Sequence, residues 1–109
     1  MRVIRMAEYE ELESVSDLML GVFNRSMQDD YSAEGRDIFL NEIALSSLQK
    51  RFFDKSVFYL CCQKDEVEGF LELEQPSHIA FLFVTEEGVG IGKALCMQLF
   101  DDLKEGYLS

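Results

Sequence analysis

The chain has 109 residues, with 21 acidic and 10 basic side chains, and therefore a formal charge of −11 at pH 7. The length predicts one domain over residues 1–109, and the negative charge argues against nucleic acid and anionic membranes as partners. No run approaches the roughly 18 apolar residues of a membrane span, and the N-terminus lacks a signal-peptide pattern. We therefore expect a cytoplasmic protein.

The first elements are a short β-prone stretch over residues 2–6 and a helix from residue 8 to about residue 28. Acidic side chains gather at the start of this helix, where the helix dipole favours negative charge. The helix is predicted because apolar residues recur at helical spacing, namely Leu12, Val15, Met19, Val22 and Phe23.

The next segment is predicted to be helical but interrupted. Ser32 is placed to cap a helix that begins near Ala33, and Ser46 with Gln49 matches the capping-box pattern of a further turn. Residues 33–53 therefore form either two helices or one broken helix.

Three strands follow, over residues 57–62, 67–74 and 78–84. The first and the third are apolar on both faces, which for the first suggests an interior strand. In the second, Gly69 suggests a bulge or a close approach of another element, and alternation places Leu71 and Leu73 on one face and Phe70, Glu72 and Glu74 on the other.

The last predicted element is a helix through residues 94–104, which makes the order strand, helix, helix, three strands, helix. Short connections between consecutive strands argue for an α+β fold with a mixed, mainly antiparallel sheet flanked by helices. The cysteines Cys61, Cys62 and Cys96 lack metal-ligand spacing, so we expect free thiols and no metal site.

Gly88, Gly90 and Gly92 lie between the third strand and the last helix. A P-loop would need a glycine at Glu87 and a hydroxyl at Ala94, and it fails at both positions. A dinucleotide fingerprint fails because the third glycine is missing and the preceding strands are antiparallel.

Two interpretations of the glycines remain. One is a plain tight turn into a helix. The other is an anion site, because a glycine-rich turn at a helix N-terminus exposes backbone N–H groups and the positive end of the helix dipole. Lys93 adds a positive charge in the first turn.

Glu87-x-x-Gly90-x-Gly92, continuing into Lys93, resembles motif A (Q/R-x-x-G-x-G/A) of the GCN5-related N-acetyltransferases. The order of elements resembles this family over essentially all of residues 1–109 and implies an acyl-CoA N-acyltransferase fold. Glu87, however, stands where the family has Gln or Arg, and Glu86 adds a second carboxylate. Relative to the family the sequence lacks the strands that follow the glycine helix, so the resemblance implies a C-terminally truncated fold. The sequence is then a fragment, a truncated relative, or a chain whose missing cofactor wall comes from a partner subunit.

The resemblance implies acetyl transfer from acetyl-CoA to an amine by direct attack in a ternary complex. It assigns the strand that would hold the pantetheine arm to Leu82, Phe83 and Val84. It assigns the pyrophosphate loop to Val89, Gly90, Ile91, Gly92 and Lys93. The family commonly uses a tyrosine after the next strand as general acid, and Tyr107 cannot be assigned that role.

His78 is the candidate general base, because it opens the strand H-I-A-F where one branch of the family has a glutamate. The alternative is a histidine that only marks a turn-to-strand boundary. Glu72 and Glu74 are weaker candidates and are expected to be solvated. An acceptor site could be lined by Phe23, Asn24 and Tyr31, although Phe23 also fits the core.

An exposed apolar strand at a sheet edge favours association. We therefore expect a homodimer or a domain swap that covers residues 78–84. The alternative to an enzyme is a non-catalytic acidic binding module that keeps the fold, in which Glu86 and Glu87 would close the glycine turn to anions.

Overall fold

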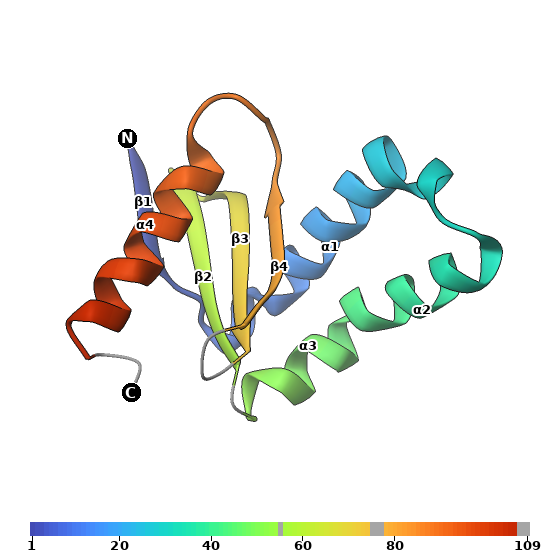
Figure 1. Ribbon diagram of the computed structural model, residues 1–109, viewed down its shortest axis with the longest axis horizontal. Helices are drawn as coiled ribbons and strands as arrows, with labels where there is room; N and C mark the ends of the chain where they lie inside the picture. The colour runs from blue at the N-terminus through green and yellow to red at the C-terminus, as the bar shows by residue number, and fades with distance from the viewer. Residues whose placement is uncertain (55, 75–77, 107–109) are drawn as a thin grey trace.

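The computed structural model describes residues 1–54, 56–74 and 78–106 of the chain (Figure 1). In order, the elements are β1 (Arg2–Met6), η1 (Tyr9–Glu11), α1 (Leu12–Val22), η2 (Phe23–Met27), η3 (Gln28–Asp30), α2 (Ala33–Ile43), α3 (Leu45–Phe52), β2 (Ser56–Gln63), β3 (Glu66–Glu74), β4 (His78–Val84) and α4 (Ile91–Lys104). The described strands form one sheet of order β1-β2-β3-β4, and every pairing in it is antiparallel. The predicted α+β class and order of elements are confirmed.

The helix predicted from residue 8 to about residue 28 is a succession of helical geometries. A 3-10 turn precedes α1, and the π-helical segment η2 and the 3-10 turn η3 extend it to Asp30. Its core face is the one that the spacing predicted, since Leu12, Val15, Met19 and Phe23 are fully buried. The π-helical segment was not foreseen, and such segments often occur at functional sites.

The segment over residues 33–53 is two helices that are separated at Ala44, whose backbone is extended. The predicted Ser32 cap is confirmed, because its hydroxyl accepts a hydrogen bond of 3.0 Å from the Gly35 amide. The predicted Ser46 capping box is wrong. Helix α3 already begins at Leu45, because the Ala44 carbonyl accepts bonds from the amides of Ser47 and Leu48.

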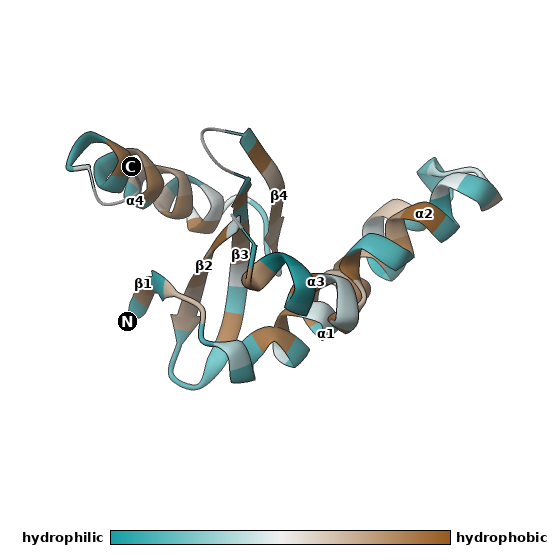
Figure 2. Cartoon of the chain, turned by 90° about the horizontal axis from the view of Figure 1, so that it is seen from below, coloured by the Kyte–Doolittle hydropathy of each residue, from teal (hydrophilic) through white to brown (hydrophobic). Residues whose placement is uncertain are grey.

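The sheet separates two apolar layers (Figure 2). Helices α1, α2 and α3 cover one face, where the core includes Leu48, Phe58 and Phe70. Among the described helices only α4 covers the other face, where Ile91, Leu95 and Leu99 pack on Tyr59, Leu71 and Leu73. The strand alternation predicted for residues 70–74 is therefore confirmed. None of the described helices is long and apolar enough to cross a bilayer.

Gly69 explains how α4 lies so close to the sheet. A Cβ atom at Gly69 would stand 2.5 Å from Cγ2 of Ile91 and 3.0 Å from Cδ1 of Leu95. The β2–β3 register also shifts beside it, between Cys61 and Cys62. Both readings of this glycine from the sequence, a bulge and a close approach, thus apply.

A second attachment of α4 is polar. The Tyr59 hydroxyl donates a 2.6 Å hydrogen bond to Asp102 of α4, and Gln98 donates to the other carboxylate oxygen at 3.0 Å. Burial and the neighbouring Asp102 raise the pKa of Tyr59 above its ordinary value. The helix that follows the glycine turn is thus fixed to the sheet near both of its ends.

Candidate active site

The glycine turn joins the end of β4 to the start of α4, and it forms the loop that connects them at the top of Figure 1. Gly88 and Gly90 have φ values of +82° and +87°, a conformation that only glycine adopts at little cost. A Cβ atom at either position would meet nothing within 4 Å. Gly88 and Gly90 are therefore needed for the left-handed backbone of the turn, and the space beside them is open.

Helix α4 begins without a side-chain cap. Gly90 is its N-cap residue, no acidic side chain lies in its first turn, and the first helical bond runs from the Ala94 amide to the Gly90 carbonyl. The amides of Ile91, Gly92 and Lys93 precede that bond, at the positions where helices lack intrahelical partners. The Ile91 side chain is 2% exposed and belongs to the core, so only its backbone can face a ligand.

Strand β4 is the edge of the described sheet, and no described strand pairs with its outer side. Its register against β3 shifts, because Glu72 is opposite Phe81 and Leu73 is opposite Ile79. Ala80 is left without a cross-strand partner, which is a β-bulge. Bulges leave backbone groups outside the ladder and are common beside active sites.

The bulge determines on which face of the sheet each side chain of β4 lies. Phe81 and Phe83 pack on the side of α1, α2 and α3, whereas Ile79 and Val84 pack on the side of α4. Leu82 is 42% exposed, and a Cβ atom at Gly92 would lie 3.8 Å from its side chain. The three residues predicted to hold a pantetheine arm therefore do not share one face.

His78 is exposed at the start of β4, opposite Glu74 in the register. Simple alternation would place it on the face of Leu82 and Val84, but the bulge places it on the face of Phe81. It lies at the opposite end of the strand from the glycine turn. The turn before it, residues 75–77, falls outside the described residues, as does Tyr107.

Glu72 is not the solvated carboxylate that the sequence suggested. It is fully buried and accepts two hydrogen bonds from Arg51 of α3, at 2.7 and 3.1 Å. Arg51 also lies over the Phe81 ring, with its guanidinium carbon 5.5 Å from the ring centroid. This ion pair supports β4 beside the bulge, and Glu72 has no free lone pair facing solvent with which to act as a base.

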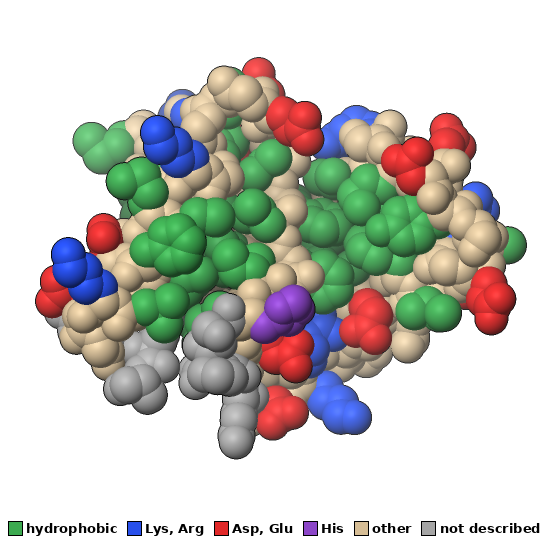
Figure 3. All heavy atoms as spheres, in the orientation of Figure 1, with side chains coloured by type: hydrophobic (Ala, Val, Ile, Leu, Met, Phe, Trp, Pro, Cys, Tyr) green, Lys and Arg blue, Asp and Glu red, His purple; other side chains and the backbone are tan. Residues whose placement is uncertain are grey.

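A groove of about 670 Å³ runs along β4 on the side of η2 (Figure 3). In Figure 3 hydrophobic side chains gather on both sides of this strand. The described residues that line the groove come from α1, η2, β4 and the glycine turn, and they are Val22, Arg25, Ser26, Met27, Leu82, Phe83, Val84, Thr85, Glu86 and Glu87. Glu86 and Glu87 thus line this groove.

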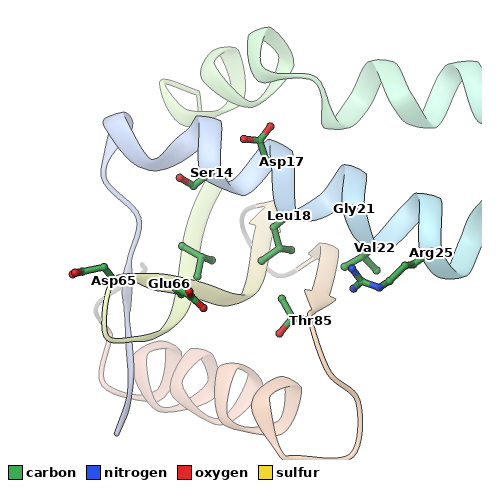
Figure 4. Close-up of a pocket in the computed structure, with 10 residues that line it drawn as sticks. Ser14, Asp17, Leu18, Gly21, Val22, Arg25, Asp65, Glu66 and Thr85 are labelled. Carbon is green, nitrogen blue, oxygen red and sulfur yellow. The ribbon is translucent and has the colours of Figure 1, made fainter.

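A second cavity of about 430 Å³ adjoins the groove at Thr85 (Figure 4). It lies between α1 and the β2–β3 turn, and it shares Val22, Arg25 and Thr85 with the groove. Figure 4 shows Arg25 reaching from the helical segment toward the end of β4. Asp17, Asp65 and Glu66 also line this cavity, which makes it acidic.

The expected acceptor residues divide between core and surface. Phe23 is fully buried, Asn24 is exposed, and Tyr31 is partly buried with its ring 5.4 Å from that of Phe23. Phe23 therefore belongs to the core, which was the second of the two roles that the sequence allowed for it.

The cysteines form no disulfide, and burial raises the pKa of both Cys61 and Cys62, which makes them poor nucleophiles. The described residues contain no group of three or more His, Cys, Asp or Glu side chains placed to hold a metal ion.

Sequence reasoning missed three features of this region: the bulge at Ala80, the groove beside η2 and the Glu72–Arg51 pair. Only the last left a signal, because Glu72 stands between Leu71 and Leu73 in the chain and follows Phe70 on its own strand face. The other two depend on how distant segments meet.

Comparison with known families gives a match to the acetyltransferase (GNAT) domain over residues 27–108. None of the curated proteins matches the chain.

Solved structures are similar over nearly the whole chain. One is the PaiA N-acetyltransferase of Thermoplasma acidophilum in complex with coenzyme A, at 18% identity and a TM-score of 0.83, covering 99% of this chain and 75% of that one. Another is a GCN5-related N-acetyltransferase of Rhodopseudomonas palustris, at 18% identity and a TM-score of 0.77, covering 98% and 68%. A third is a GNAT acetyltransferase of Staphylococcus aureus Mu50, at 15% identity and a TM-score of 0.76, covering 99% and 70%.

Proposed function

The chain belongs to the GNAT acetyltransferase family, and on that premise we propose that it transfers an acetyl group from acetyl-CoA to an amine. The observation that carries the proposal is the uncapped start of α4 behind two left-handed glycines, next to the unpaired edge of β4. The three free cysteines fit a reducing compartment, so we place this activity in the cytoplasm.

The glycine turn fits a pyrophosphate. The space above Gly88 and Gly90 is open, and the first-turn amides of α4 point out of the helix with the positive end of its dipole. Lys93 is exposed in the same turn. In this proposal the backbone from Val89 to Lys93 binds the pyrophosphate, and Leu82, Phe83 and Val84 bind the pantetheine arm through the outer edge of β4.

In this proposal the acetyl transfer takes place beside the bulge at Ala80. Acetyl-CoA, when bound, supplies an activated acyl group as a thioester. The amine nitrogen attacks the carbonyl carbon, the carbon–nitrogen bond forms as the carbon–sulfur bond breaks, the amine loses a proton and the CoA sulfur gains one. A backbone N–H freed from the ladder beside Ala80 is suited to polarise the carbonyl oxygen. His78, exposed on the same strand, is the proposed acceptor of the amine proton.

The test is whether the 109-residue chain binds CoA, and binding is measured by calorimetry and by the shift in thermal unfolding. CoA at about 100 times its Kd stabilises a protein by about 2.7 kcal/mol, which raises Tm by several degrees in a domain of this size. Glu87→Gln removes a negative charge beside the turn and is expected to tighten binding about threefold at low salt, whereas Lys93→Gln weakens it about threefold.

The control is Glu10→Gln in the distant η1 turn, which changes the net charge equally and should leave CoA affinity unchanged. If wild-type chain and Glu87→Gln both fail to bind CoA, the second candidate function stands. That candidate is a non-catalytic GNAT-fold binding module, which the two carboxylates at the groove favour.

The outer edge of β4 also supports a proposed homodimer or domain swap. The strand carries no charged residue between His78 and Val84, and an uncharged open edge invites pairing with another chain. Leu82→Lys should therefore give a monomer in analytical ultracentrifugation when the wild-type chain is a dimer. Leu20→Lys is the matched control, because both leucines are 42% exposed and Leu20 lies on α1. A monomeric wild-type chain at high micromolar concentration rejects this proposal.

A further inference from the structure

We propose that Arg51 of α3 is a positioning residue for acetyl transfer, because it holds in place the bulge at Ala80 whose backbone faces the thioester in the proposed reaction. The inference rests on the proposed function and adds to it a residue that acts through the backbone of β4. It is carried by the contacts that Arg51 makes with β3 and β4 at the point where their register shifts.

The residues next to the bulge both face Arg51. Glu72 of β3 is opposite Phe81 of β4, and directly beyond this pair the register shifts and leaves Ala80 without a partner. Glu72 and Phe81 lie on the side of the sheet that α3 covers, since both contact Arg51. One side chain of α3 therefore touches both strands beside the bulge.

The contacts of Arg51 fix its guanidinium group in one plane. Its Nε donates a 2.7 Å hydrogen bond to Oε2 of Glu72, and its Nη2 donates a 3.1 Å bond to Oε1, the bidentate geometry that is typical of strong arginine–carboxylate pairs. The guanidinium carbon lies 5.5 Å from the centroid of the Phe81 ring, within the range of a cation–π contact. The guanidinium thus links the Phe81 ring to the carboxylate of its partner on β3.

This link opposes the register in which the bulge is absent. If the pairing at the start of β4 continued without a shift, Ala80 would lie opposite Glu72, and Phe81 would move to the face of α4. The contact between Phe81 and Arg51 would then be lost. The other way to pair Ala80 would take Ile79 out of the apolar layer beneath α4, so packing opposes that register and Arg51 opposes the first.

Burial makes the Arg51–Glu72 pair costly to break. Glu72 is fully buried, and a carboxylate that loses its partner in such a place is a buried, uncompensated charge. Glu42 of α2 also accepts a bond from Arg51, but at 3.4 Å and with a side chain that is 52% exposed, so this second pair contributes little. The link between the strands therefore depends on Glu72 and not on Glu42.

The position of the bulge matters for the chemistry because a hydrogen-bond donor polarises a carbonyl only when it is already in place. In the proposed reaction that donor is a backbone N–H beside Ala80. The glycine turn that binds the pyrophosphate in the same proposal begins beyond Val84. Loss of the Arg51 contacts should therefore change the polarisation of the thioester more than the affinity for CoA.

The experiment compares infrared spectra of acetyl-CoA, labelled with carbon-13 at its carbonyl group, bound to the 109-residue chain. A hydrogen bond lowers the carbonyl stretching frequency, so the wild-type band is expected below that of free acetyl-CoA. Arg51→Met should return the band at least half of the way to the free value, while CoA affinity measured by calorimetry stays near that of wild type. Glu42→Gln is the matched control and should leave the band at its wild-type frequency.

A double variant separates positioning from stability. Arg51→Met combined with Glu72→Leu removes the buried charge and should restore most of the stability, but it restores no contact with Phe81. Its carbonyl band should therefore stay with that of Arg51→Met. A band that returns to the wild-type frequency in the double variant would show that Arg51 acts only through stability, and it would overturn the inference.

The remaining outcomes separate this inference from the proposed function. If the wild-type chain binds no CoA, the proposed function and the role of Arg51 are both wrong. If the chain binds CoA but the band of bound acetyl-CoA equals that of the free molecule, no donor acts at the bulge and the positioning role is wrong. An Arg51→Met band at the wild-type frequency overturns the positioning role alone and leaves acetyl transfer standing.

Discussion

Arg51→Met will lower the free energy of unfolding by about 3 kcal/mol, because it leaves the fully buried Glu72 without its cation. Removing one member of a buried ion pair typically costs about 3–5 kcal/mol. The lower end of that range applies, because the Arg51 side chain is 22% exposed and water can reach the site that it vacates. Urea denaturation of wild type and variant measures the difference.

Glu42→Gln is the control for this substitution. Glu42 also pairs with Arg51, but at 3.4 Å and with a side chain that is 52% exposed, so its loss should cost less than about 0.5 kcal/mol. The double variant Arg51→Met, Glu72→Leu removes both charges and should recover most of the lost stability. Equal losses for Arg51→Met and Glu42→Gln would contradict the assignment of Glu72 as a buried, paired carboxylate.

Gly69→Ala is expected to destabilise the chain by about 1–3 kcal/mol, the usual cost of overpacking a core. The new methyl group would stand 2.5 Å from Ile91 and 3.0 Å from Leu95, so α4 must move away from the sheet. Because Ile91 is the first residue of α4, the glycine turn must move with it. Unfolding in urea gives the stability, and a CoA titration should show weaker binding.

Gly21→Ala tests whether the effect at Gly69 comes from crowding. A Cβ atom at Gly21 would meet only the tip of Arg25, at 3.9 Å, within helix α1. Replacing a helical glycine by alanine should then stabilise the chain by about 0.5–1 kcal/mol. If Gly69→Ala is as stable as wild type, the close contact of α4 with β3 is not a constraint on the fold.

Local patterns in the sequence were enough to predict the elements. The spacing of Leu12, Val15 and Met19 predicted the buried face of α1, the Ser32 hydroxyl predicted the start of α2, and alternation about Leu71 predicted the faces of β3. These features depend on neighbours in the chain. The glycine turn was found for the same reason, because its residues are contiguous.

The features that the sequence did not predict depend on residues far apart in the chain. The partner of Glu72 lies 21 positions away in α3, so a carboxylate that looked solvated is buried. Phe39 stacks on Phe83 across 44 positions of sequence, and no periodicity joins them. The capping box at Ser46 failed because the N-cap is Ala44, two residues earlier, and the helix already begins at Leu45.

The unpaired Ala80 shifts the side-chain alternation of β4 by one residue. Side chains before it and after it alternate with opposite parity, so that Ile79 contacts the layer of α4 while Phe81 contacts the layer of α1, α2 and α3. Deletion of Ala80 would give regular alternation with every remaining side chain on its present face, whereas pairing Ala80 into the ladder would exchange the faces of all residues on one side of it. The two packing faces of β4 therefore do not depend on Ala80, and what this residue adds is backbone that lies outside the ladder.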